Sequence, residues 1–154
     1  MSSAFTFGKR SLERLKGVHP DLVRLAREAL RESSQDFTVI EGLRTVARQR
    51  ELVAAGASQT MDSRHVTGHA IDCAAWVGEV RWDAGLYYPI AAAFQRASKA
   101  LAIPVRWGGC WLRLDTTDKT PNVLVAEYVA SRRAAGRKAF VDMPHFELPQ
   151  GVYP

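Results

Sequence analysis

The segment 63–76, SRHVTGHAIDCAAW, constrains the fold most, because it predicts a β-strand with two chemically different faces. Side chains along a strand point alternately to its two sides. Asp72 therefore faces one side, while His69 and Cys73 face the other. His65 lies in the preceding turn and can face either way. Two pairs of candidate metal ligands stay open: His65 with Asp72, or His69 with Cys73.

The rest of the chain mixes helical and strand patterns without a regular alternation. Apolar residues at helical spacing predict helices over 19–33, 45–56, 83–102 and 122–136. Short strands are predicted within 36–44, 68–74, 104–109 and 139–149. His19 begins the first of these helices and is expected to cap it or to lie at the surface. This order predicts an α+β fold with a small antiparallel sheet and flanking helices.

Length and charge limit the class of protein. A chain of 154 residues fits one domain, which we expect to span 1–154. No apolar run approaches the roughly 18 residues that cross a bilayer, so stable membrane insertion is not expected. The net charge of +5 favours an anionic partner. Because the basic residues are spread along helices and form no dense tail, we expect no nucleic acid among its partners.

The N-terminal segment and the cysteines indicate the compartment. Residues 1–17 lack the apolar core of a secretory signal, so we expect synthesis to end in the cytoplasm. Cys73 and Cys110 are too few for a disulfide framework. We therefore expect two reduced thiols.

The segment DMPHFE near the C-terminal end supplies what a hydrolytic metal site would still need. A catalytic zinc ion takes three protein ligands and keeps one position open, and His145 is the third candidate for either pair. Asp142 stands three residues earlier, where a carboxylate could take a proton from a water molecule. Arg44 could stabilise negative charge on a carbonyl oxygen. Its alternative role is an ion pair with Glu41 or with the C-terminal region.

Two motifs in this order resemble a known family. The segment SRHVTGHAID fits Ser-x-His-x-x-Gly-x-Ala-x-Asp, and DMPHFE supplies a downstream Asp-x-x-His. Together they resemble the VanY-like zinc D-alanyl-D-alanine carboxypeptidase family, and most closely the phage endolysins that are L-alanyl-D-glutamate peptidases. The segments FGKRSLERLKGVHPDLV, DFTVIEGLRT, RWGG and PHFEL occur in the order that this resemblance requires.

The resemblance assigns a role to each candidate residue. It implies that His65, Asp72 and His145 hold one zinc ion per chain. It implies that Asp142 is the catalytic acid and base, and that Arg44 polarises the substrate carbonyl. His69 and Cys73 would then be packing residues on the opposite face of the strand.

Other positions match the family or depart from it. Ser63 and Gln49 match family positions near the site and are expected to support the ligands and the arginine. Cys110 stands where the family often has an acidic residue; a role as a further ligand or as a partner of Cys73 is the alternative to a free thiol. The stretch 112–139 is longer than in compact members and is expected to shape the substrate groove. The tryptophans are expected in the core or the groove wall: Trp76, Trp82, Trp107 and Trp111.

The resemblance also implies a fold and a biological role. We expect a Hedgehog/DD-peptidase-like domain with a zinc cleft and no separate cell-wall-binding module. The expected activity is hydrolysis of the L-Ala-D-Glu bond in the stem peptide of bacterial peptidoglycan by a monomeric phage lysis enzyme. It would stay in the host cytoplasm until a holin gives it access to the periplasm and cell wall. The alternatives are a D-Ala-D-Ala carboxypeptidase and a noncatalytic wall-binding module.

Overall fold

A computed structural model describes residues 4–154, so the first three residues of the predicted domain and of its N-terminal segment lie outside it. The helices are α1 (Lys9–Arg14), α2 (Pro20–Glu32), α3 (Val46–Ala54), α4 (Ala84–Leu101) and α5 (Pro121–Ala134). The strands are β1 (Phe37–Glu41), β2 (Ala70–Trp76), β3 (Val80–Arg81), β4 (Arg106–Trp107), β5 (Leu112–Arg113) and β6 (His145–Glu147). The four predicted helices are confirmed, with ends within two residues, and each predicted strand region overlaps a strand. Helix α1 and strands β3 and β5 were not predicted.

The strands form one antiparallel sheet, as the sequence predicted. Their order is β1-β2-β6-β4-β5, with β3 paired to β2. In the register between β2 and β6, Asp72 lies opposite His145 and Ile71 lies opposite Phe146. Because side chains alternate, this pairing places the two polar residues on one face of the sheet and the two apolar residues on the other.

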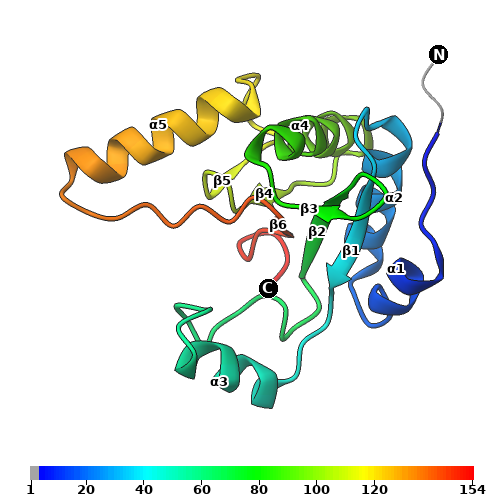
Figure 1. The fold of residues 1–154 in the computed structure, drawn as a ribbon, viewed down its shortest axis with the longest axis horizontal. Helices are drawn as coiled ribbons and strands as arrows, with labels where there is room; N and C mark the ends of the chain where they lie inside the picture. Colours follow the sequence, from blue (N-terminus) through cyan, green and yellow to red (C-terminus); the bar gives the residue numbers. More distant parts are fainter. Residues whose placement is uncertain (1–3) are drawn as a thin grey trace.

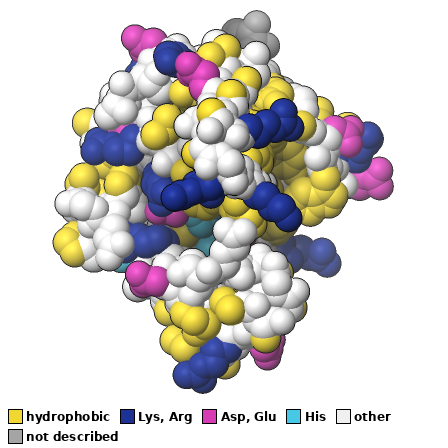
Figure 2. Space-filling model, turned by 90° about the vertical axis from the view of Figure 1, so that its left-hand side faces the viewer, with side chains coloured by type: hydrophobic (Ala, Val, Ile, Leu, Met, Phe, Trp, Pro, Cys, Tyr) yellow, Lys and Arg dark blue, Asp and Glu magenta, His cyan; other side chains and the backbone are white. Residues whose placement is uncertain are grey.

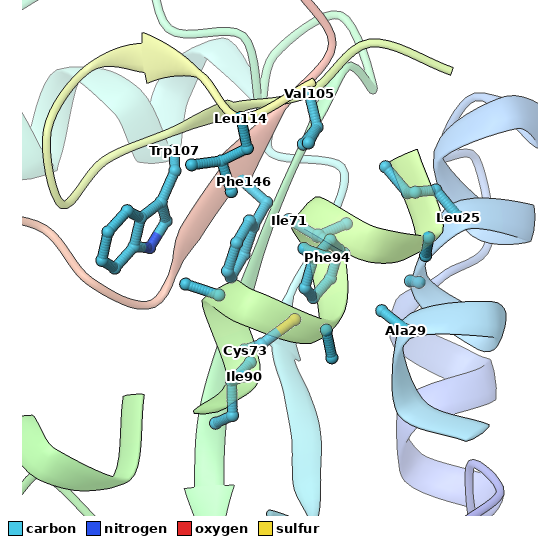
Figure 3. Packing of buried hydrophobic residues seen from close by; sticks show 14 of the residues in the cluster. Leu25, Ala29, Ile71, Cys73, Ile90, Phe94, Val105, Trp107, Leu114 and Phe146 are labelled. Atoms are coloured by element: carbon cyan, nitrogen blue, oxygen red, sulfur yellow. The ribbon is translucent and has the colours of Figure 1, made fainter. Parts of the chain in front are cut away.

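The apolar face of the sheet is closed by helices α2 and α4 (Figure 1). Figure 3 shows Ile71 and Phe146 of the sheet packed toward Phe94 of α4, with Leu25 of α2 further out. The rings of Phe94 and Phe146 stack with centroids 3.8 Å apart. Cys73 is fully buried in the same cluster. This core leaves the opposite face of the sheet to carry the polar residues.

A bulge shifts the register between β1 and β2 at the edge of the sheet. Val39 pairs with Cys73, but Glu41 pairs with Asp72, so β1 contains one residue more than β2 across this step. Bulges of this kind redirect side chains. Here the bulge brings Glu41 beside Asp72.

The start of α2 is held by its cap and by the C-terminal segment. The His19 Nδ1 atom accepts a hydrogen bond from the backbone N–H of Asp21 at 3.1 Å, which confirms the predicted capping role. The Tyr153 hydroxyl donates to the Asp21 carboxylate at 2.6 Å. Among residues 4–154, no helix combines the length and the apolar character needed to cross a membrane.

Candidate metal centre

Three side chains converge on the polar face of the sheet. The Oδ1 atom of Asp72 lies 3.2 Å from Nε2 of His65 and 3.2 Å from Nδ1 of His145. One ligand atom from each residue lies within 4.8 Å of the others, so the group could hold a metal ion. The structure therefore brings together the three residues that the resemblance implied, and it places His65 on the side of Asp72.

The far nitrogen of each histidine is already held by the protein. The Nδ1 atom of His65 lies 2.9 Å from the carbonyl oxygen of Gly42, and Nε2 of His145 lies 2.8 Å from Oε1 of Glu147. An N–H group at each of these atoms donates to an oxygen, so the other ring nitrogen, which is directed at Asp72, is the one that could give up its proton and bind a metal ion. Two imidazoles fixed in this way and one carboxylate are a donor set that suits a catalytic zinc ion with an open position.

The ligand group is strongly coupled electrostatically. Burial alone would raise the pKa of Asp72, but hydrogen bonds from His145 and His65 outweigh it and hold this pKa well below the ordinary value. Burial alone would lower the pKa of His145, but hydrogen bonds to Asp72 and Glu147 outweigh it and raise this pKa to about 9. Without a metal ion, His145 therefore carries a positive charge between the carboxylates of Asp72 and Glu147.

Asp142 lies in the same cleft and its backbone is clamped on both sides. The indole of Trp111 donates to the carbonyl of Phe140 at 2.7 Å, and the indole of Trp107 donates to the carbonyl of Met143 at 2.8 Å. The backbone N–H of Asp142 donates to the carbonyl of Gly108 at 2.9 Å. A Cβ atom on that glycine would lie 2.3 Å from the Asp142 carbonyl oxygen, so the close approach requires glycine.

The environment of Asp142 favours its protonated form. Burial raises the pKa of this carboxyl group, and the negative charge of Asp72 adds to the shift. A carboxyl group with a raised pKa beside a metal ligand set is suited to accept a proton and to return it.

Arg44 lies beside the ligand group and forms one of its two predicted contacts, the ion pair with Glu41. Its guanidinium makes two hydrogen bonds to Glu41, at 2.5 and 2.7 Å, so the predicted ion pair is present. It also lines the cleft, with Nη2 3.8 Å from Oδ2 of Asp72. Gln49 accepts a hydrogen bond from Nη1 at 2.7 Å, and Ser63 lies 3.5 Å from the same atom. These contacts agree with the expectation that Gln49 and Ser63 support the arginine.

The other candidate ligands lie outside the group. The His69 ring packs against His19 with centroids 5.5 Å apart, and its Nδ1 atom lies 2.7 Å from the Thr67 hydroxyl. Cys73 and Cys110 are both buried free thiols, as predicted, and within residues 4–154 neither belongs to the metal-type group.

The group lies in an open cleft with a volume of about 970 Å³. Figure 2 shows histidine side chains inside this hollow, with Lys and Arg side chains around its rim. Helix α3 and helix α5 extend on the same side of the molecule and contribute to opposite parts of the lining (Figure 1). Tyr128 and Arg132 of α5 line the cleft, so the stretch 112–139 does shape it.

Sequence reasoning missed several residues of the cleft and misplaced two tryptophans. Glu147 and Arg106 line it but were not singled out. A signal for Glu147 was available, because it follows His145 by two positions and so shares its face of the strand. Trp107 is buried and Trp111 lines the cleft, as expected. The expectation was wrong for Trp76 and Trp82, whose rings are exposed.

A small α+β domain with a His-Asp-His group, a neighbouring carboxyl group and a buried arginine in one cleft has the features of a metal-dependent hydrolase. The model of the phage L-alanyl-D-glutamate peptidase family matches residues 3–148, and the chain belongs to this family. The resemblance on which the site residues were assigned is thereby confirmed at the level of the family.

Two relatives agree with this membership. The chain is 41% identical to the L-alanyl-D-glutamate peptidase of Escherichia phage T5 over 113 residues, which are 70% of this chain and 82% of that protein. The crystal structure of the Serratia marcescens L-Ala D-Glu endopeptidase ChiX matches with a TM-score of 0.76 and 43% sequence identity. That match covers 98% of this chain and 95% of ChiX, and it supports the α+β fold.

Proposed function

We propose that this protein is a zinc-dependent peptidoglycan endopeptidase that hydrolyses the L-Ala-D-Glu bond of the stem peptide and so lyses the bacterial cell wall. The observation that carries the proposal is the family match over residues 3–148, in a chain whose cleft holds the His65, Asp72 and His145 group. The named activities of the phage T5 and Serratia relatives support the choice of bond.

Zinc fits the ligand group better than a hard cation does, because two of its three donors are imidazole nitrogens. We propose that His65, Asp72 and His145 hold one ion per chain. When bound, the ion would act as a Lewis acid and would lower the pKa of a water molecule toward about 7. The hydrogen bonds to Gly42 and Glu147 keep both imidazoles oriented for this task.

Asp142 and Arg44 carry the protein's own part of the reaction. Asp142 accepts a proton from the attacking water and returns it to the leaving amine, and its raised pKa suits both steps. Arg44 donates to the carbonyl oxygen on which negative charge develops. Its contacts with Glu41 and Gln49 fix the guanidinium before substrate binds, so no reorganisation is needed during the reaction.

The proposal includes a fold family and a cellular route. We assign the domain to the Hedgehog/DD-peptidase type, with the cleft as its zinc site, and we propose that it works as a monomer. The enzyme would remain in the host cytoplasm until a holin opens the membrane. It would then act on peptidoglycan from the periplasm, where its net charge of +5 would favour an anionic surface.

Digestion of purified murein by the zinc-loaded protein tests the proposed bond. New amino termini on D-Glu are expected. Released D-Ala would indicate a D-Ala-D-Ala carboxypeptidase instead, and binding without any cleavage would indicate a noncatalytic wall-binding module.

Two substitutions test the assigned roles in the same assay. Asp142→Asn should keep its zinc but lose at least about 100-fold in rate, because the proton carrier is removed. His65→Ala should lose both zinc and activity. Asp118→Asn on an exposed loop is the matched control and should behave as the wild type. Full activity of Asp142→Asn would contradict the mechanism.

A further inference from the structure

Arg106 is held rigidly at the wall of the cleft, although the mechanism above does not use it. Its Nε atom donates to the carbonyl of Trp111 at 2.9 Å, and Nη1 donates to Oε2 of Glu147 at 3.4 Å. The guanidinium carbon also lies 5.0 Å from the centre of the Trp111 ring. A long, flexible side chain that lines the cleft is thereby fixed in one position, and 40% of it is still exposed.

The residue that holds Arg106 has a strained backbone. Trp111 has φ +59°, a left-handed conformation that is an outlier for a bulky side chain. Its N–H donates to the carbonyl of Trp107 at 2.7 Å, and its indole is bound to Phe140. Strain of this kind persists only where surrounding contacts enforce it, and it gathers at functional sites. Here it presents both the carbonyl and the ring face of Trp111 to Arg106.

The contacts of Arg106 leave part of its guanidinium available. Nη2 makes no hydrogen bond with any residue from 4 to 154, although it belongs to a side chain that lines the cleft. Its carboxylate partner is shared, because Oε1 of Glu147 is bound to His145. On the same wall, Nε of Arg132 in α5 donates to the backbone carbonyl oxygen of Lys138. This acceptor is uncharged, so it does not neutralise the guanidinium. This wall therefore has spare positive charge and free N–H donors close to the ligand group.

A substrate with a D-glutamyl residue after the cut bond carries a matching group. This residue is joined to the chain through one of its two carboxyl groups, so the other remains a free carboxylate near the reacting amide. An arginine held in place can bind a carboxylate with two parallel hydrogen bonds. We propose that Arg106 is a specificity-determining residue that binds the free carboxylate of this D-glutamyl residue. The proposal rests on the proposed endopeptidase function.

Two synthetic stem peptides test this assignment, one with the free D-glutamyl carboxylate and one with the same group as a carboxamide. The wild type should cleave the acid with a kcat/KM about 10- to 100-fold above that of the amide, because a charge-assisted contact is lost. Arg106→Gln should cleave both peptides at similar low rates, mainly through a higher KM for the acid, with unchanged zinc content. Arg106→Lys should keep part of the preference.

Arg48→Gln is the matched control, because Arg48 lies on the exposed surface of α3 in an ion pair with Glu51. It should retain the wild-type preference. Equal cleavage of both peptides by the wild type would overturn the assignment while leaving the endopeptidase function intact. An Arg106→Gln enzyme that keeps the preference would also overturn it. Equal losses of kcat/KM on both peptides in Arg106→Gln, together with loss of zinc, would overturn it as well. Such a result would show that Arg106 acts only by holding Glu147. A wild type that cleaves neither peptide would overturn the function and this inference together.

Discussion

The Oε1 atom of Glu147 lies 2.8 Å from Nε2 of His145, and both residues are buried on the same face of β6. Burial alone would raise the pKa of Glu147, but the hydrogen bond from His145 and the positive charges of His145 and Arg106 together outweigh it and lower this pKa. The carboxylate thus stays charged and determines which nitrogen of His145 points at Asp72. Carboxylates in this position raise the basicity of a metal-bound histidine.

We predict that Glu147→Gln weakens zinc binding about 10- to 100-fold. The amide can still accept a hydrogen bond but no longer supplies a charge to the imidazole. Competition with a chelator of known affinity would measure the loss. Glu127→Gln, on the exposed side of α5, should bind zinc as the wild type does. Equal affinities of the two variants would refute this role for Glu147.

Arg44→Lys should lower kcat about 100- to 1,000-fold while zinc content stays unchanged. Lysine cannot reproduce the paired hydrogen bonds to Glu41 together with the bond to Gln49, so its charge would no longer be fixed beside the scissile carbonyl. Steady-state kinetics on the acid peptide would measure the change. The corresponding substitution at the exposed Arg48 should leave kcat unaltered, and a similar loss there would argue against a specific role for Arg44.

The stability of the metal-free protein should fall as the pH rises through about 9. The pKa of His145 is raised from 6.5 to about 9, so the proton on this residue stabilises the fold. That contribution is fully present below pH 6.5 and is lost as His145 deprotonates. Thermal melts of EDTA-treated protein between pH 6 and 10 would show the decrease. His145→Gln should abolish this dependence, and a wild-type melting temperature that is constant over the range would contradict the prediction.

Ala102→Gly should stabilise the protein by about 1 kcal/mol. Ala102 ends α4 with φ 54° and ψ 38°, a left-handed conformation that glycine adopts without a steric penalty. Chemical denaturation would measure the gain. Ala100→Gly is the matched change inside the last turn of the same helix, and it should destabilise by about 1 kcal/mol. Destabilisation by both substitutions would show that the Ala102 conformation carries no strain.

Local patterns in the sequence were sufficient for the helices and for the faces of β2. Helical spacing located four helices to within two residues at each end. Strand alternation separated Asp72 from Cys73, and the structure places Cys73 in the core and Asp72 in the cleft. Both patterns reflect the geometry of a single element, which its own residues determine.

Alternation could not choose between the two pairs of ligands, because His65 lies in a turn. The two motifs favoured His65 with Asp72, and the structure brings these side chains together with His145. The choice depended on the pairing of β2 with β6, whose partners Asp72 and His145 are 73 residues apart.

The sequence by itself determined the helices, the alternation of β2 and, through its two motifs, the candidate ligands. Only the tertiary structure decided what surrounds them: the bulge that brings Glu41 beside Asp72, the indole bonds that clamp Asp142, and the position of Arg106 beside Glu147. The physical reason is the range of the interactions. Periodicity is local, whereas these contacts depend on strand register and on hydrogen bonds between distant segments, which no single stretch of sequence encodes.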